Sequence, residues 1–358
     1  MRSLLLKAAA LSIAALTTGG CLLFTSVSQL GSGDVASGAS DGGDEVTSEG
    51  GDEVTSEGGA DTAPNAGDFA PAEALAHDSP GLSGIAVDET NVYWTNSTTG
   101  LLSRAPKAST NAAVTTAVNR PPTPGEVTVF NGRVYVGSTG LQDGSDGLYS
   151  YAPDGTGMQQ HLGYCRFARI LTADALFLSY DGANSSDDMI ARFSVDRQLS
   201  TVVKLGDSLP SALAYDGTSV FYYVASMPKT IQRVTLGGAA GLFVQEDDVA
   251  DMLADVTTLY ALTITGNLVA HPIAGGAPRT IASGLIGARR LVADDAAFYV
   301  SAAGLSPTSG RVVQIRKSDG MARDLATNQA GPSAIAVTHS GLYWLDSGDG
   351  SVMRAVRR

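Results

Sequence analysis

Short runs of apolar residues, broken by polar turns, repeat along most of the chain. In residues 83–96 a run ending at Val87 is followed by four polar residues and a second run that contains Tyr93 and Trp94. Two such runs around a short polar segment predict a β-hairpin. The pattern returns at 333–346, and a gapless alignment of 83–105 with 333–355 is identical at 10 of 23 positions. The hairpin is therefore one unit of an internal repeat.

Five weaker copies lie between these two. The aromatic residue at the Tyr93 position marks the series Tyr93, Tyr135, Phe177, Phe221, Tyr260, Tyr299 and Tyr343, with gaps of 42, 42, 44, 39, 39 and 44 residues. A period near 42 is the length of a β-propeller blade of four short strands. Helical repeats of similar length require apolar residues at a 3.6-residue period, which this chain does not have.

The first unit shows all four strands, which we expect at 85–87, 92–95, 101–105 and 113–118. The seventh unit supplies three strands before the sequence ends at Arg358. Residues 69–78 have the right length for its missing outer strand. Because an open ring leaves strand edges unpaired, we expect this N-terminal strand to close the ring. The predicted fold is an all-β propeller of seven four-stranded blades, with six as the alternative if the unit around Tyr260 is distorted.

The repeats resemble a known class of propeller. Gly84-Ile-Ala-Val-Asp88 with Val92-Tyr-Trp-Thr-Asn96, and Ile335-Ala-Val337 with Leu342-Tyr-Trp-Leu-Asp346, look like YWTD and NHL-type repeats. They are most similar to the propeller lipoproteins of uncharacterised function common in myxobacteria. The resemblance covers about residues 69–358 and implies a fold rather than an activity. YWTD propellers proper have six blades, whereas seven units are counted here.

The N-terminal segment reads as a secretion signal. Arg2 and Lys7 precede an apolar core that is too short to span a bilayer, so we expect residues 1–20 to be a signal peptide. Its end, Thr17-Thr-Gly-Gly-Cys21, resembles the lipobox of bacterial lipoproteins, with Thr18 where Leu is usual. That resemblance implies lipidation of Cys21 and an outer-membrane lipoprotein of the cell envelope. An ordinary cleaved signal, and hence a secreted protein, is the alternative.

Residues 21–68 form the predicted linker between the lipidated cysteine and the propeller at 69–358. From residue 22 on this linker has ten acidic residues, no Lys or Arg, and a tandem octapeptide at 43–50 and 51–58. Few apolar groups and one sign of charge predict a disordered spacer. The chain carries a formal charge of −13, most of it in this spacer. The modest charge left to the propeller argues against nucleic acid as a partner.

The first residues of each innermost strand are the candidate binding positions. In a propeller these residues gather at the mouth of the central channel, and here they include Glu126, Arg169, Asp251 and Arg290. Four such side chains fit either a mixed-charge ligand site or a set of structural ion pairs. The sequence favours the ion pairs.

Other chemistry finds little support in the sequence. The four histidines, His77, His161, His271 and His339, lack metal-ligand spacing, and no nucleophile elbow or phosphate-binding loop is present. Acidic loops such as 346–349 contain oxygen ligands that suit calcium, but not in the alternating order of a calcium loop. We therefore expect no catalytic residues, no metal and no cofactor.

These observations favour a non-enzymatic, lipid-anchored propeller that binds a protein, peptide or glycan at the cell envelope, and acts as a monomer. Two alternatives remain. One is a propeller enzyme of the lactonase or lyase type, which places several carboxylates, Asn or His at the channel mouth. The other is a purely structural envelope component.

Overall fold

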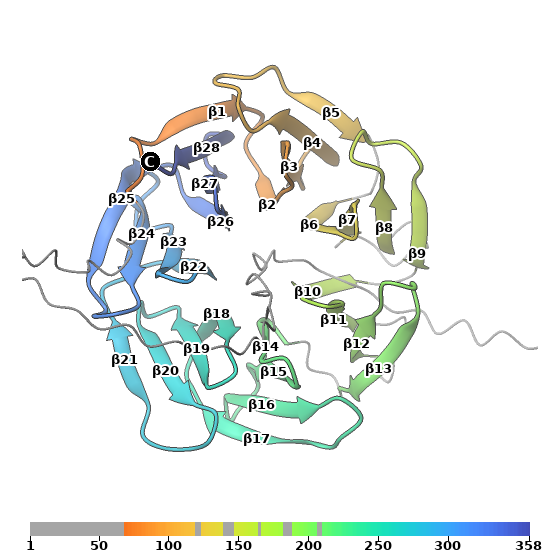
Figure 1. The fold of residues 1–358 in the computed structure, drawn as a ribbon, viewed down its shortest axis with the longest axis vertical. Helices are drawn as coiled ribbons and strands as arrows, with labels where there is room; N and C mark the ends of the chain where they lie inside the picture. Colours follow the sequence, from red (N-terminus) through yellow and green to blue (C-terminus); the bar gives the residue numbers. More distant parts are fainter. Residues whose placement is uncertain (1–67, 119–122, 139–146, 164–165, 182–187, 206–209) are drawn as a thin grey trace, which may run out of the picture.

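A computed structural model describes residues 68–118, 123–138, 147–163, 166–181, 188–205 and 210–358. For residues 117–118, 166–172 and 180–181 it describes the backbone alone. The described residues form 28 β-strands and no helix, and the strands make seven antiparallel four-stranded sheets. The sheets stand as blades around a central channel (Figure 1). The prediction of seven blades is confirmed, and the six-blade alternative is excluded.

In blades 1 to 6 the strands run in chain order from the channel to the rim. Blade 1 contains β2 (Leu82–Val87), β3 (Asn91–Asn96), β4 (Leu101–Pro106) and β5 (Thr115–Val118), and blade 2 contains β6 (Pro124–Phe130), β7 (Arg133–Ser138), β8 (Gly147–Tyr151) and β9 (Gln159–Gly163). Blade 3 contains β10 (Arg166–Thr172), β11 (Leu176–Asp181), β12 (Met189–Phe193) and β13 (Leu199–Lys204), and blade 4 contains β14 (Leu213–Tyr215), β15 (Ser219–Val224), β16 (Thr230–Thr235) and β17 (Ala240–Gln245).

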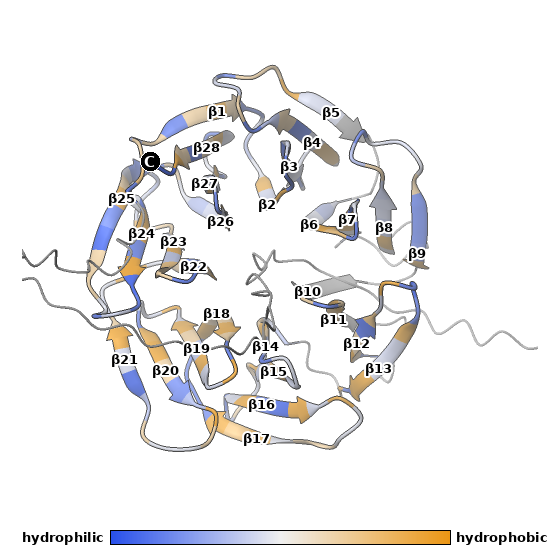
Figure 2. Ribbon diagram, in the orientation of Figure 1, coloured by the Kyte–Doolittle hydropathy of each residue, from blue (hydrophilic) through white to orange (hydrophobic). Residues whose placement is uncertain are grey.

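Blades 5 to 7 complete the ring. Blade 5 contains β18 (Val249–Ala254), β19 (Thr258–Thr263), β20 (Leu268–Pro272) and β21 (Arg279–Ala282), and blade 6 contains β22 (Ala288–Ala293), β23 (Ala297–Ala302), β24 (Gly310–Arg316) and β25 (Ala322–Gln329). Blade 7 takes β26 (Pro332–Thr338), β27 (Gly341–Asp346) and β28 (Ser351–Val356) from the end of the chain and β1 (Glu73–His77) from near its start. The outer strands face solvent and carry many hydrophilic residues, as in β25 (Figure 2).

Strand β1 closes the ring as the sequence predicts. It pairs antiparallel with β28, with His77 opposite Ser351 and Glu73 opposite Arg354. The guanidinium of Arg354 adds an ion pair to the Glu73 carboxylate at 2.7 Å. The pairing covers the edge of β28 and gives blade 7 its fourth strand, which is the physical advantage that predicted it.

Apolar side chains from neighbouring blades form the core. Among the described residues, seven clusters of buried apolar side chains each join two adjacent blades. Successive residues of a strand point to opposite faces. Tyr93 therefore packs with Val127 of blade 2, while Trp94 packs with Ala334 of blade 7. The recurring aromatic pair therefore fills the wedges between blades.

An aspartate caps the turn between the first and second strands in several blades. In blade 1, Asp88 Oδ1 accepts hydrogen bonds from the amides of Thr90 and Asn91. Asp216, Asp255 and Asp294 do the same in blades 4, 5 and 6. This Asx-turn chemistry satisfies amides that the tight turn would otherwise leave unpaired.

The antiparallel topology gives the ring two distinct faces. We call the mouth face the side that carries the turns between second and third strands and the connections from one blade to the next. We call the base face the side that carries the other turns. Residue Asp68 enters at the base face, where its carbonyl accepts a hydrogen bond from the amide of Arg358 and the neighbouring Arg357 amide bonds the turn residue Ser340. The described part of the chain therefore begins at the base face.

Candidate functional site

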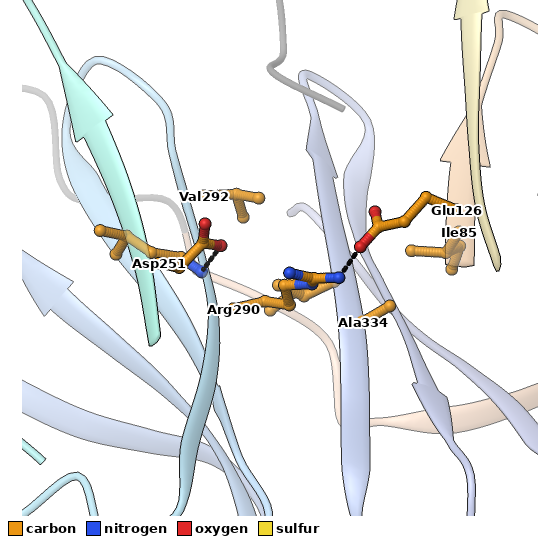
Figure 3. Close-up of a pocket in the computed structure, with 8 residues that line it drawn as sticks. Ile85, Glu126, Asp251, Arg290, Val292 and Ala334 are labelled. Carbon is orange, nitrogen blue, oxygen red and sulfur yellow. Dashed lines mark hydrogen bonds and ion pairs between the residues drawn. The ribbon is translucent and has the colours of Figure 1, made fainter. Parts of the chain in front are cut away.

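The first residues of the innermost strands surround a small pocket at the channel mouth (Figure 3). The space inside it is about 10 Å³, which suits one water molecule. Its lining residues are Ile85, Glu126, Asp251, Arg290, Leu291, Val292, Ala334 and Ile335. Three of the four predicted site residues therefore meet here.

A salt bridge crosses the channel within this pocket. The guanidinium of Arg290 on β22 pairs with Glu126 Oε1 on β6, so the pair joins blade 6 to blade 2 with blades 7 and 1 between them. Glu126 is buried and Arg290 is half-buried. Buried charges are stable only when they are paired. The pair satisfies both charges and closes the channel at this level.

Asp251 links blade 5 to the backbone of blade 6. Its Oδ2 atom accepts a hydrogen bond of 3.0 Å from the amide of Leu291 in blade 6, and its Oδ1 atom accepts one of 3.1 Å from the amide of Met252. Both carboxylate oxygens of this buried residue are thus engaged by amides, and Figure 3 shows one of the two bonds. Asp251 therefore joins the innermost strands of blades 5 and 6 through a hydrogen bond.

The fourth predicted residue, Arg169, lies on β10 and pairs through its backbone with Ser179. Its side chain lies outside the described part of the structure. Cys21 and Cys165 also fall outside the described residues. The structure therefore gives the geometry of Glu126, Asp251 and Arg290 only.

β-Bulges aim these side chains at the channel. The register of the first two strands shifts at the corresponding point in six of the seven blades, and the six first strands concerned are β2, β6, β10, β18, β22 and β26. A bulge rotates the strand locally and redirects a side chain. In β18 the shift falls immediately before Asp251, and in β22 it falls immediately before Arg290. No sequence signal marks these bulges, and they bring the polar residues together.

Close packing beside the pocket fixes blade 1 against blade 2. A Cβ atom at Gly84 would lie 2.6 Å from the Glu126 Cα atom and 2.8 Å from the Gly125 carbonyl oxygen. Ser83 Oγ reaches the same Gly125 carbonyl at 3.1 Å. A glycine at this position allows the backbone of β2 to lie against β6.

A second feature of the mouth face is a row of exposed apolar side chains over blades 4 to 6. This apolar arc consists of Met227, Ile264, Ile286 and Leu305. Met227 is 85% exposed and Leu305 is 87% exposed. Large apolar side chains of this kind are usually buried. The corresponding turns of blades 1 and 7 contain Ser, Thr, Gly and Asp instead. The sequence analysis did not identify the arc.

Hydrogen bonds and one ion pair connect the loops that carry the arc. Lys229, two residues after Met227, pairs with Asp248 at 2.6 Å, and the carbonyl of Asp248 accepts from the amide of Ile264. The next links join Leu285 N to Gly266 O and Gly304 N to Ile286 O. The loops that carry the four apolar residues are therefore linked to one another across blades 4 to 6.

The histidines lie away from the channel mouth. His77, His161 and His271 lie on β1, β9 and β20, and His339 lies in a turn of the base face. His161 Nε2 shares a hydrogen bond of 2.7 Å with the hydroxyl of Ser150, and burial together with the charges of Arg197 and Arg133 lowers the pKa of His161 to about 4. Within the described ranges no group of three or more His, Cys, Asp or Glu side chains is placed to hold a metal ion. No helix in those ranges is long and apolar enough to cross a membrane.

Solved propellers share this fold at low sequence identity. A streptogramin B lyase matches 81% of this chain and 98% of its own, with a TM-score of 0.63 and 12% identity. The virginiamycin B lyase of Staphylococcus aureus matches with a TM-score of 0.62 and 11% identity, over 81% of this chain and all of its own. The WD40 propeller domain of Doa1 matches equally well, with a TM-score of 0.62 and 10% identity over 82% of this chain and 98% of its own.

These likenesses establish a β-propeller fold. They include a WD40 domain as well as lyases, so they do not distinguish a binding domain from an enzyme. No protein-family model matches the chain, and no curated protein matches it in sequence.

Proposed function

We propose that this protein is a non-enzymatic, lipid-anchored β-propeller that binds a protein or peptide partner of the cell envelope on its mouth face. The observation that carries the proposal is the apolar arc of Met227, Ile264, Ile286 and Leu305. Exposed apolar side chains on a rigid surface are typical of protein-binding sites. Sugar hydroxyls need polar partners, so the arc favours a protein or peptide over a glycan.

The channel-mouth residues take a supporting part in this proposal. Glu126, Asp251 and Arg290 form a charged centre at the channel mouth, and we propose that Arg169 on β10 joins them. An interface with an apolar patch beside paired charges gains orientation from the charges and affinity from the apolar contact. In this arrangement the apolar part of the ligand contacts the arc, and its polar groups contact the charged residues at the channel mouth.

The direction of chain entry fits a tethered receptor. Asp68 enters at the base face, opposite the apolar arc. With Cys21 lipidated and residues 22–68 acting as a spacer, the mouth face points away from an outer membrane. Such a monomeric module agrees with the resemblance of its repeats to propeller lipoproteins, and its acidic spacer disfavours nucleic acid as a partner. Replacing Cys21 with Ser tests the anchor, because the protein then leaves the membrane fraction.

The alternative is a channel-mouth enzyme related in reaction to the lyase neighbours. Chemistry of that kind needs side chains free to act as acid, base or metal ligand. In this chain the Glu126 carboxylate is engaged by Arg290, and that of Asp251 by two amides. A purely structural envelope role is the remaining alternative, and it leaves the exposed arc unexplained.

Paired variants test the proposal. Peptides are selected from a random display library against the whole purified protein and then measured against two double variants. Met227→Ser with Leu305→Ser alters the arc, whereas Val256→Ser with Met321→Ser alters equally exposed apolar residues on the base face, 80% and 61% exposed. We expect at least a tenfold loss of affinity for the arc variant and little change for the control.

Two results would overturn the proposal. One is selected peptides that bind both variants as tightly as the parent protein. The other is a stoichiometric divalent metal in the purified protein together with turnover of a lactone substrate, which establishes the enzyme instead.

A further inference from the structure

Asn96 shows how the mouth-face turn of blade 1 is held. Its Nδ2 amide donates to the carbonyl of Ser79 at 2.8 Å, and its Oδ1 atom accepts from the amides of Thr98 and Thr99. The side chain therefore ties its own turn to the connection that enters blade 1. The position of Asn96 therefore uses a side chain that has both a hydrogen-bond donor and an acceptor.

Blade 7 has an aspartate at the same place. Asp346 pairs with Pro332 across the sheet as Asn96 pairs with Leu82, and the two segments are the near-copies in the sequence. Asp346 is only 3% exposed, and its Oδ1 atom has no hydrogen-bond partner. The carbonyls that correspond to those of Ser79 and Pro80 belong to Gln329 and Ala330. An ionised carboxylate has no hydrogen to donate to them.

The charged surroundings make ionisation of Asp346 costly. Burial and the negative charge of Asp349 in the same turn raise the pKa of Asp346 to about 7, although the Ala330 amide partly opposes this. The other titratable groups at this end of the blade lie on or next to β1. His77 Nδ1 is 3.2 Å from the hydroxyl of Ser351, and Asp78 accepts from Trp94. Among the described side chains no Lys or Arg forms an ion pair with Asp346.

We propose that Asp346 is a proton-operated latch at the closing blade. In its acid form the carboxyl group donates to the carbonyl of Gln329, as the Asn96 amide donates to Ser79. When the proton leaves for solvent, the carboxylate keeps the amide of Ala330 as a donor, but it can no longer donate to that carbonyl and it carries the same charge as Asp349. The turn at 347–350 then keeps its backbone bonds from Ser347 to Gly331 and from Gly348 to Ala330 but loses one tie to the connection from blade 6, next to the point where β1 closes the ring.

The sign of the pH dependence follows from the direction of the shift. A group whose pKa is higher in the folded state binds more protons when folded, so it stabilises the fold less as the pH rises. The change takes place between the ordinary aspartate value of 3.8 and about 7. Above neutral pH the latch is open and its contribution is fully lost.

Reciprocal variants of the whole chain test the latch by thermal unfolding at pH 5 and pH 8. Asp346→Asn supplies a permanent donor, so we expect its melting temperature to rise relative to that of the parent protein by about 3 °C or more between pH 5 and pH 8. Asn96→Asp installs the latch in blade 1, and we expect it to lose more stability at pH 8 than at pH 5. Asp349→Asn keeps Asp346 but removes the negative charge beside it, so we expect this variant to lose less stability than the parent between pH 5 and pH 8.

The Asn96→Asp variant keeps the test decisive if Asp346→Asn does not fold. A constant difference between the parent and Asp346→Asn at both pH values would overturn the proposal, as would equal losses of Asn96→Asp at both. A rise in the melting temperature of the parent with calcium at pH 8, absent from Asp346→Asn, would replace the proton by a cation and overturn it as well.

Discussion

The hydroxyl of Tyr93 donates a hydrogen bond to Asp88 Oδ2 at 2.7 Å, five residues earlier in the chain. The same bond joins Tyr260 to Asp255 at 3.0 Å and Tyr299 to Asp294 at 2.8 Å. One carboxylate thus caps a turn with one oxygen and holds the buried aromatic ring of the next strand with the other. This pairing makes the aromatic position of the repeat specific for tyrosine in these blades.

Replacing Tyr93 with Phe removes this bond and leaves the ring in place. We expect the free energy of unfolding to fall by about 1 kcal/mol, the usual net value of a buried hydrogen bond. Blade 7 provides the matched control. Its turn has Thr338 at the position of Asp88, so it offers Tyr343 no aspartate to accept a hydrogen bond. Tyr343→Phe should therefore cost clearly less in the same urea titration. Equal costs for the two variants contradict the assignment.

Acid should weaken the fold through these turn carboxylates. Burial alone would raise the pKa of Asp255, but hydrogen bonds from Thr257, Tyr260 and Thr258 outweigh it and hold the pKa below its usual value of 3.8. A lowered pKa in the folded state gives stability that is present above the ordinary value and lost as the pH falls below it. We expect the melting temperature to drop steeply below about pH 4.

The variant Asp255→Asn tests the source of that loss. It keeps an acceptor for the turn but no longer ionises, so its melting temperature should fall less between pH 5 and pH 2.5 than that of the parent. Asp319→Asn, on an exposed turn of blade 6, is the control and should leave the slope unchanged. A parallel fall in all three proteins excludes Asp255 as a contributor.

The salt bridge across the channel should matter far more than an exposed one. Glu126→Gln leaves the Arg290 guanidinium without its counter-charge in a confined site, and we expect a loss of about 3 kcal/mol. Breaking the exposed Arg316–Asp319 pair with Asp319→Asn should cost no more than about 0.5 kcal/mol. The double variant Glu126→Gln with Arg290→Met should recover part of the first loss, because no unpaired charge remains. Additive costs in this cycle contradict a direct interaction.

Nearly all of the fold can be predicted from the repeat pattern. Apolar runs and their 42-residue period locate the strands of the seven blades, and the need to pair an edge assigns residues 69–78 to blade 7. The bond between Asp88 and Tyr93 was also within reach, since the same five-residue spacing recurs at Asp255 and Asp294. Local chemistry repeated at fixed spacing is visible in a sequence.

The candidate site was predictable only in part. Position along the innermost strands placed Glu126, Asp251 and Arg290 at the mouth, but not the partner of each. Those partners depend on bulges that rotate the strands, and on blades that meet across the channel. The exposure of Met227 and Leu305 depends on how their loops are supported by neighbouring blades. Both depend on tertiary geometry that no periodicity encodes.

Gly84 provides a test of how closely the innermost strands must pack. Its missing side chain lets β2 approach the backbone of β6, where a Cβ atom would meet Glu126 Cα at 2.6 Å. Backbone atoms cannot move aside as the end of a long side chain can, so Gly84→Ala should separate blades 1 and 2 and cost about 1–3 kcal/mol. Gly241→Ala on the outer strand β17, where a Cβ atom meets nothing within 4 Å, is the matched control and should be neutral or slightly stabilising. Because Gly84 lies against the backbone that carries Glu126, its variant should lower the benefit of the Glu126–Arg290 pair in a double-variant cycle. If Gly84→Ala unfolds at the same urea concentration as Gly241→Ala, the close approach of the two strands is not what requires glycine at this position.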